Sequence, residues 1–165
     1  MSIPKRHSSP DRIRSERTFF VTSATWSHRA LLQSDANAIL FIDVLFAYRA
    51  QGRYALHALV VMPDHFHALL TASAENSIER IVQYIKGGFS FRASRELGRR
   101  GEFWQKGFSE VSILSFERFS ATKQYIHQNP IRRGLCVLAD EYPYSSANRI
   151  YELDPVPLRL KPLDL

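Results

Sequence analysis

The stretch Val60-Val61-Met62-Pro63-Asp64-His65-Phe66-His67-Ala68-Leu69-Leu70 decides the fold that we expect of this chain. Two apolar runs meet at a Pro-Asp turn, which predicts a hairpin between strands over residues 54–62 and 65–71. Side chains alternate between the faces of a strand, so His65 and His67 project from one face and Phe66 from the other. Two imidazoles in register form half of a metal site, whereas the plainer interpretation is two partly exposed histidines beside a turn.

The residues around this hairpin predict an α+β domain. A β-branched and aromatic run precedes it, helical patterns with serine or aspartate caps flank it, and short strand patterns follow. The order strand, helix, strand, strand, helix, strand fits a ferredoxin-like βαββαβ antiparallel sheet, to which a C-terminal helix is added. The other expected strands are 18–25 and short pieces at 103–104 and 110–114, and the expected helices are 34–51, 78–97 and 116–129.

Two local signals predict interruptions in these helices. Gly87-Gly88 lies inside the second helical pattern and predicts a kink or break there. Pro130 predicts the end of the last helix at Asn129, because the residue before proline avoids the helical region.

Composition and charge limit the class of protein. The chain has 165 residues, which favours one domain, and a net charge of +6 with a pI near 9.7. Such a charge favours a polyanionic partner such as nucleic acid, although a solvated basic surface gives the same balance. Cys136 is the only cysteine, which excludes an intrachain disulfide and a cysteine-rich zinc cluster. We expect no secretory signal, no membrane span and a cytoplasmic, nucleoid-associated location.

The chain divides into three expected segments. Residues 1–16 are polar and basic and predict a flexible arm that contacts phosphates or is simply mobile. Residues 17–139 hold the folded domain. Residues 140–165 are rich in proline and predict an extended tail with little structure of its own.

The last helix carries side chains that complement the histidine pair. At about 100° per residue, Arg118, Tyr125 and Asn129 fall on one stripe, and Tyr125 and Asn129 are neighbours at i and i+4. His127 points roughly opposite to Tyr125. Taken separately, Tyr125 reads as a surface tyrosine and Asn129 as an ordinary residue near a helix end.

These groups together predict phosphoryl-transfer chemistry. A tyrosine hydroxyl is a weak nucleophile at neutral pH, but it can attack phosphorus when a divalent cation polarises the phosphate. His65, His67 and the Asn129 oxygen could hold that cation, and mixed nitrogen and oxygen ligands without thiolate favour Mg²⁺ or Mn²⁺. The cations expected to surround Tyr125 and clamp phosphates are Arg118, Lys123, Arg132 and Arg133.

Several motifs resemble those of a known family. The segment from Val61 to His67 resembles the HUH motif (His, hydrophobic, His) of single-tyrosine transposases of small insertion sequences. The segment from Tyr125 to Leu135 resembles the catalytic-helix motif of their REP-associated subgroup. Three shorter segments, 20–26, 103–105 and 142–146, also fit that subgroup, so the similarity covers roughly residues 17–147.

The resemblance implies a fold and a set of roles. It implies a ferredoxin-like sheet with Tyr125 as the nucleophile, His65 and His67 as metal ligands and Asn129 as the third ligand, with Gln128 as a second choice. It also implies cleavage of single-stranded DNA that leaves a 5′-phosphotyrosine and a free 3′-OH, which later attacks the adduct. Residues 17–139 would then be an HUH transposase catalytic domain.

Partners follow from the same resemblance. Relatives bind hairpins of palindromic DNA, and the arm, the tail, Arg92 and Arg95 are the further surfaces that we expect to bind it. The sequence leaves open whether the protein is a monomer or a homodimer. It also leaves open whether one subunit or two build the site. The competing functions are an HUH replication initiator or relaxase, which the short chain disfavours, and a nucleic-acid-binding module without catalysis.

Overall fold

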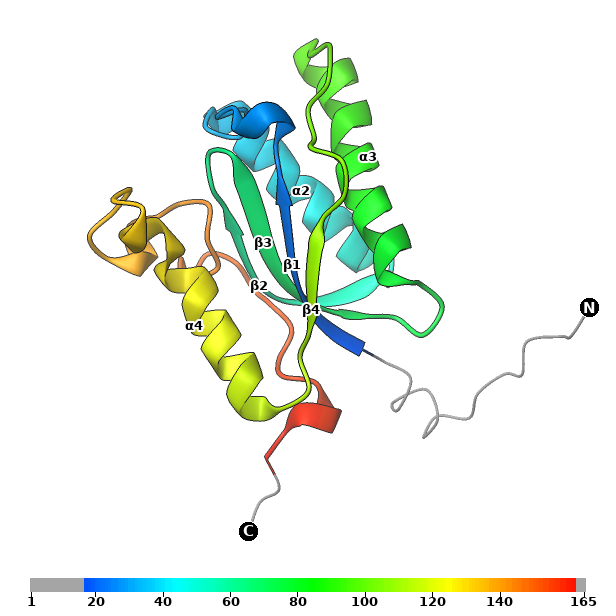
Figure 1. Ribbon diagram of the computed structural model, residues 1–165, viewed down its shortest axis with the longest axis vertical. Coiled ribbons are helices and arrows are strands. Elements are labelled where there is room, and N and C mark those ends of the chain that lie inside the picture. The colour runs from blue at the N-terminus through cyan, green and yellow to red at the C-terminus, as the bar shows by residue number, and fades with distance from the viewer. Residues whose placement is uncertain (1–16, 163–165) are drawn as a thin grey trace, which may run out of the picture.

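The computed structural model describes residues 17–162, and its centre is a four-stranded antiparallel sheet (Figure 1). The strand order is β2-β3-β1-β4, which is the ferredoxin-like arrangement that the sequence predicts. The strands are β1 (Arg17–Ala24), β2 (Tyr54–Val61), β3 (His65–Ala72) and β4 (Ser109–Ser112). The predicted basic arm over residues 1–16 lies outside the described residues.

The expected hairpin forms between β2 and β3, and β3 is central. It pairs with β2 on one side and with β1 on the other, so its backbone is held along both edges. The register places Thr22 of β1 opposite His67 and Ala24 opposite His65. The two histidines are therefore fixed on a strand that cannot slide without breaking two ladders.

Two helices cover the face of the sheet that Phe66 enters (Figure 1). They are α2 (Asp35–Ala50) and α3 (Ile78–Leu97), and the serines before them, Ser34 and Ser77, accept hydrogen bonds from backbone N–H groups of the first turns. Burial of aromatic and aliphatic side chains from the sheet and both helices forms the larger core.

The predicted break at Gly87-Gly88 is wrong, because α3 runs without interruption from Ile78 to Leu97. A Cβ atom at Gly88 would lie 2.5 Å from the hydroxyl oxygen of Tyr48 on α2, whereas a Cβ at Gly87 would meet nothing within 4 Å. Gly88 therefore permits close approach of two helices. Packing against α2 outweighs the low helix propensity of the glycine pair.

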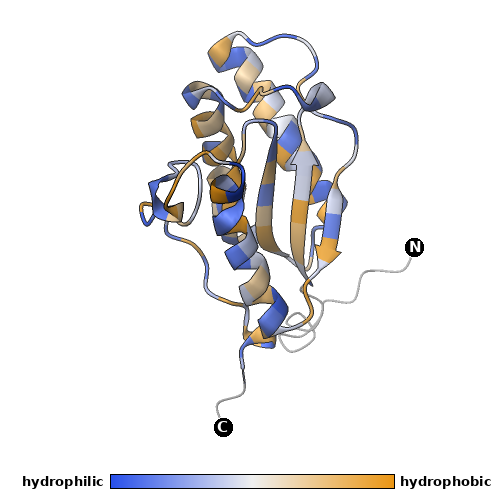
Figure 2. Cartoon of the chain, turned by 60° about the vertical axis from the view of Figure 1, so that its left-hand side comes forward, coloured by the Kyte–Doolittle hydropathy of each residue, from blue (hydrophilic) through white to orange (hydrophobic). Residues whose placement is uncertain are grey.

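The third helix, α4 (Phe116–Arg132), lies on the opposite face of the sheet (Figure 1). Colouring by hydropathy shows apolar and polar bands alternating along it (Figure 2), as an amphipathic helix requires. Its apolar residues Phe119 and Ile126 join a smaller core with Val60 and Leu69 of the sheet.

Pro130 does not end α4 at Asn129, as the sequence predicted, since the helix continues to Arg132. Proline lacks the N–H that would bond to the carbonyl four residues earlier, but only the final turn is affected. The backbone N–H of Arg133 still bonds to the Asn129 carbonyl, and Pro130 is buried against the domain. The burial of Pro130 and the Arg133 hydrogen bond hold the last turn helical beyond the proline.

The described part of the proline-rich segment has only short 3₁₀ turns, Ala139–Glu141 and Leu158–Leu160, yet it packs closely on the domain. Ser145 forms a bridge with Val60, and the Tyr142 hydroxyl donates to the Val61 carbonyl. Further along, Asp154 accepts hydrogen bonds from Arg49 and from the Leu56 backbone. The segment thus runs along the otherwise open edge of β2.

None of the helices over residues 17–162 combines the length and the apolarity needed to cross a lipid bilayer.

Candidate active site

One cavity of about 360 Å³ brings the predicted site residues together. It lies between the histidine end of β3 and the C-terminal half of α4. Among its lining residues are both histidines of the HUH motif and both predicted residues of α4. The full lining is Thr22, Ala24, His28, Asp64, His65, His67, Tyr125, Asn129, Arg132 and Arg133.

His65 is oriented by the aspartate that precedes it. Its Nδ1 lies 2.7 Å from Oδ1 of Asp64. A carboxylate only accepts hydrogen bonds, so Nδ1 carries the proton and Nε2 of the neutral ring is left as the basic nitrogen. Burial, the largest single effect, would raise the pKa of Asp64, but the hydrogen bond to His65 and the nearby charges of His65 and Arg133 together outweigh it, and the pKa is lowered.

His67 is oriented from the neighbouring strand. Its Nδ1 lies 2.7 Å from the hydroxyl oxygen of Thr22, its partner in the β1–β3 register. Burial, with the nearby charges of His65, Arg132 and Arg133, lowers the pKa of His67 to about 3. The imidazole is therefore neutral at physiological pH, which is the form that binds metal ions.

Tyr125 lies beside His67, with 5.8 Å between the ring centroids, and is 45% exposed. The guanidinium carbon of Arg132 lies 4.1 Å from the centre of the tyrosine ring, and the same guanidinium donates to the Tyr125 carbonyl. This contact fixes a positive charge against the phenol. The tyrosine is therefore half-exposed, with the positive charge of Arg132 on one face of its ring.

The two candidates for the third ligand lie in different places. Asn129 is 5% exposed and lines the histidine cavity, whereas Gln128 lines a separate groove on the other side of α4. His127 lines that separate groove and bonds to Ser146, so it is no partner for Tyr125. Of the two amides, only Asn129 is brought to His65 and His67 in the described part of the chain.

The predicted DNA-binding cations are divided among several surfaces. Arg132 and Arg133 line the histidine cavity, Arg118 lines a groove beside Tyr125, and Lys123 faces the groove that holds Gln128. Two others, Arg92 and Arg95, lie on α3, on the far face of the sheet.

The two arginines of α3 have local partners there. Arg92 forms ion pairs with Asp43 and Glu96, and Arg95 lies over the ring of Phe91. The fold therefore does not bring either residue to the cavity that holds Tyr125.

Sequence reasoning missed three polar residues that line this cavity. Thr22 could have been found from the pairing of the first strand with the histidine strand, and Asp64 from its place next to His65. His28 lies in a turn where it and Ser27 adopt positive φ angles, 53° for Ser27 and 51° for His28. Nothing in the sequence signals that turn, because such angles are uncommon for residues other than glycine.

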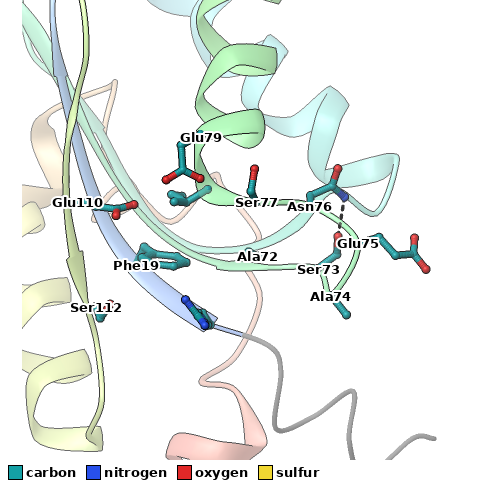
Figure 3. Close-up of a pocket in the computed structure, with 12 residues that line it drawn as sticks. Phe19, Ala72, Ser73, Ala74, Glu75, Asn76, Ser77, Glu79, Glu110 and Ser112 are labelled. Atoms are coloured by element: carbon teal, nitrogen blue, oxygen red, sulfur yellow. Dashed lines mark hydrogen bonds between the residues drawn. The ribbon is translucent and has the colours of Figure 1, made fainter. Parts of the chain in front are cut away.

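A second cavity, of about 430 Å³, lies at the opposite end of the sheet (Figure 3). Phe19, Glu79 and Glu110 are among its lining residues, and it contains no histidine or tyrosine. The described residues hold no cluster of three or more His, Cys, Asp or Glu side chains suited to a metal ion, here or elsewhere. An ion in the histidine cavity would therefore need an amide or a ligand oxygen beside the two imidazoles.

Comparisons with known proteins identify the family of the chain. A family model described as "Transposase IS200 like" matches residues 21–129, which include His65, His67, Tyr125 and Asn129. The chain is 30% identical over 103 residues to a provisionally named REP-associated tyrosine transposase of Haemophilus influenzae, an alignment that spans 56% of this chain and 58% of the relative.

Two further relatives cover more of the chain. A REP-associated tyrosine transposase of Escherichia coli is 20% identical over 140 residues, spanning 81% of this chain and 82% of the relative. A solved structure of a REP-associated tyrosine transposase bound to a REP hairpin superposes with a TM-score of 0.69 at 21% identity, covering 100% of this chain and 95% of that one. At that identity the likeness shows the shared fold.

Proposed function

The chain belongs to the IS200-like transposase family, and we propose that it cuts and rejoins single-stranded DNA through a covalent bond to Tyr125. The observation that supports this most directly is the shared cavity. Two oriented imidazoles from β3, and a phenol and an amide from α4, line one space of about 360 Å³. The family alone gives the transposase class, and the covalent chemistry rests on this geometry.

The proposed step exchanges one phosphodiester bond for another. The Tyr125 oxygen forms a bond to phosphorus while the bond from phosphorus to the 3′ oxygen breaks. The phenol loses its proton to water and the departing 3′ oxygen gains one, so protons and charge balance. Because the phosphotyrosine is itself a phosphodiester, a 3′-OH can later reverse the exchange and rejoin DNA without an energy source.

The donor set of the cavity fits a divalent cation. His65 and His67 each have Nδ1 engaged within the protein, so Nε2 remains for a ligand, and Asn129 supplies an oxygen donor. Nitrogen and oxygen donors without thiolate suit Mg²⁺ or Mn²⁺. Bound there, the ion would polarise the phosphate oxygens as a Lewis acid.

The chain's own residues would hold and orient the substrate. Arg132 and Arg133 line the cavity and attract the phosphate, since a guanidinium can donate two parallel hydrogen bonds to its oxygens. Arg132 also holds the tyrosine ring from one side, while Phe20 meets it edge-on at 5.8 Å between centroids. These contacts limit the rotation of the phenol, and limiting it favours in-line attack.

We further propose hairpin DNA as the substrate class. The support is the similarity to a protein whose solved structure is a complex with a REP hairpin, together with the net charge of +6. A nucleic-acid partner of this kind makes the affinity fall with rising salt.

The test is incubation of labelled single-stranded palindromic oligonucleotides with the protein and Mn²⁺. We expect a denaturation-resistant protein–DNA band in the wild type, lost with a chelator and in Tyr125→Phe. The matched control is Tyr84→Phe, which alters a tyrosine on α3 across the sheet and should keep the band. A band that persists in Tyr125→Phe would refute the nucleophile assignment.

The same experiment separates the catalytic proposal from a binding module. Tight, salt-sensitive binding of hairpin DNA without any covalent band under Mn²⁺ or Mg²⁺ would support the module. Calorimetric titration of Mn²⁺ into wild type and His65→Ala, without DNA, tests the metal site apart from cleavage. We expect the titration signal to be lost in the variant.

A further inference from the structure

A second groove opens on the other side of the Tyr125 ring. It has a volume of about 460 Å³ and lies between β4 and the N-terminal half of α4. Tyr125 is the residue that it shares with the histidine cavity, so the tyrosine stands between a polar space and this groove. The groove is lined by Phe20, Val111, Ser112, Ile113, Leu114, Arg118, Ala121, Thr122 and Tyr125.

The lining of the groove is apolar and accessible. Val111 is 53% exposed and Leu114 is 77% exposed, and both line this one concave surface, so they form an exposed apolar patch rather than isolated apolar residues. At its inner end, Phe20 stacks on His67 with 5.1 Å between ring centroids and meets Tyr125 edge-on. The ring of Phe20 therefore contacts both the proposed nucleophile, Tyr125, and the proposed metal ligand, His67.

The groove also carries a single cation among its lining residues, Arg118, which comes from the first turns of α4. Its charge and the aromatic end flank an apolar floor made partly by Ala121. Aromatic and apolar surfaces next to a basic group are the combination that binds single-stranded nucleic acid, where bases stack and phosphates pair with arginine.

We propose that this groove binds the base of the nucleotide next to the scissile phosphate and thereby gives the enzyme a base preference at the cut. The inference rests on the proposed function, because it places the phosphate at Tyr125. The base lies against Phe20 and the aliphatic side chains of Val111 and Leu114, and Arg118 contacts the phosphate on the far side of that nucleotide. Ala121 is a specificity-determining position, since its small side chain leaves the floor of the groove open.

The experiment uses the full chain and a library of single-stranded oligonucleotides, each with a palindromic hairpin followed by a randomised flank. After incubation with Mn²⁺, covalently captured DNA and released 3′-OH fragments are sequenced, which gives the base on each side of the cut. The variant is Ala121→Leu, which fills the groove with a good helix former at an exposed position. The matched control is Ala36→Leu, the same change at an exposed position of α2 on the opposite face.

We expect the wild type and Ala36→Leu to prefer one base, or one class of base, at a single position beside the cut. Stacking contributes about 5- to 100-fold to the affinity for a base of any kind, so the preference between bases should be smaller, about 2- to 10-fold, and set by how well each base fits the groove. Ala121→Leu should still form the covalent bond, but with that preference abolished and with a raised KM. Melting curves of the two variants check that both are folded.

Each other outcome counts against the proposal in a distinguishable way. Covalent capture by the wild type with no preference on either side of the cut overturns the base site and leaves the proposed cleavage intact. An unchanged preference in Ala121→Leu likewise overturns it. No covalent capture by the wild type from any member of the library overturns both this inference and the proposed function.

Discussion

The two faces of the sheet show how one set of strands serves two purposes. Toward α2 and α3 the strands present Phe66, Ala68, Leu70 and similar side chains, which form the large core. Toward α4 the same strands present His65 and His67 in the cavity, and only a small apolar cluster lies beside them. The alternation of side chains along β3 alone separates stability from chemistry.

The difference shows why polar groups can be positioned so firmly here. Apolar burial on the opposite face of the sheet fixes the backbone that carries the two histidines. Their own burial costs little free energy of folding, because Asp64 and Thr22 form hydrogen bonds with their Nδ1 atoms. A substitution on the α2–α3 face should therefore change stability, and one on the α4 face near the cavity should change activity.

The largest expected effect is on the apolar face. Phe66→Ala removes a ring with 0% exposure that packs against Phe41 and Trp104, and should lower the free energy of unfolding by about 3–5 kcal/mol. Urea denaturation measures it. A loss below about 1 kcal/mol would contradict the assignment of this face as the source of stability.

The next effect is on the histidine face. His67→Ala should lower the rate of covalent adduct formation by at least about 100-fold, because a donor in the cavity is removed. The control is His127→Ala, which removes a partly buried histidine that bonds to Ser146 outside the cavity and whose pKa desolvation lowers to about 4. That variant should lose some stability and retain cleavage, as a gel assay on folded protein would show. Equal losses of cleavage would contradict a special role for His67.

Asp64→Asn tests the orientation of His65 with a smaller change. The amide retains the shape but removes the carboxylate that holds the proton on Nδ1, so affinity for Mn²⁺ should fall about 10-fold in calorimetry. Asp43→Asn, on α2 and paired with Arg92, is the charge-matched control and should leave the affinity unchanged.

Adjacent glycines in α3 offer a further comparison within the apolar face. Gly88→Ala should destabilise by about 1 kcal/mol, because its Cβ meets the Tyr48 hydroxyl and overpacks the contact of α2 with α3. Gly87→Ala should stabilise by about 0.5–1 kcal/mol, since nothing lies near its Cβ and the helix gains propensity. Thermal melts of both variants would show opposite shifts, and shifts of the same sign would contradict this account of the pair.

The smallest expected effect is at the edge of β2, where Asp154 of the C-terminal segment bonds to Leu56 of the strand and to Arg49 of α2. The hydrogen bonds from Arg49 lower the pKa of Asp154 in the folded protein below its unfolded value of 3.8. The ionised carboxylate thus stabilises the fold above that pH, and the stabilisation is lost as the pH falls through the folded pKa. The stability difference between wild type and Asp154→Asn should shrink below pH 3.8 in denaturant titrations, and a difference independent of pH would count against the ion pair.

The sequence by itself determined the elements that have a local cause. Alternation placed His65 and His67 on one face, serines before three helices marked their starts, and the helical period put Tyr125 and Asn129 on one stripe. The ferredoxin-like order followed from the succession of these elements and is the order observed. The family motifs made the same residues stand out.

Only the tertiary structure decided what depends on contacts between distant segments. Packing of α3 against Tyr48 of α2 keeps α3 continuous through Gly88, and burial of Pro130 carries α4 past the proline. The C-terminal segment pairs along β2. The tertiary structure also chose Asn129 over Gln128 for the cavity, and joined Thr22 to His67 across two strands. Periodicity gives the direction of a side chain on its own element, but packing between elements decides what that side chain meets.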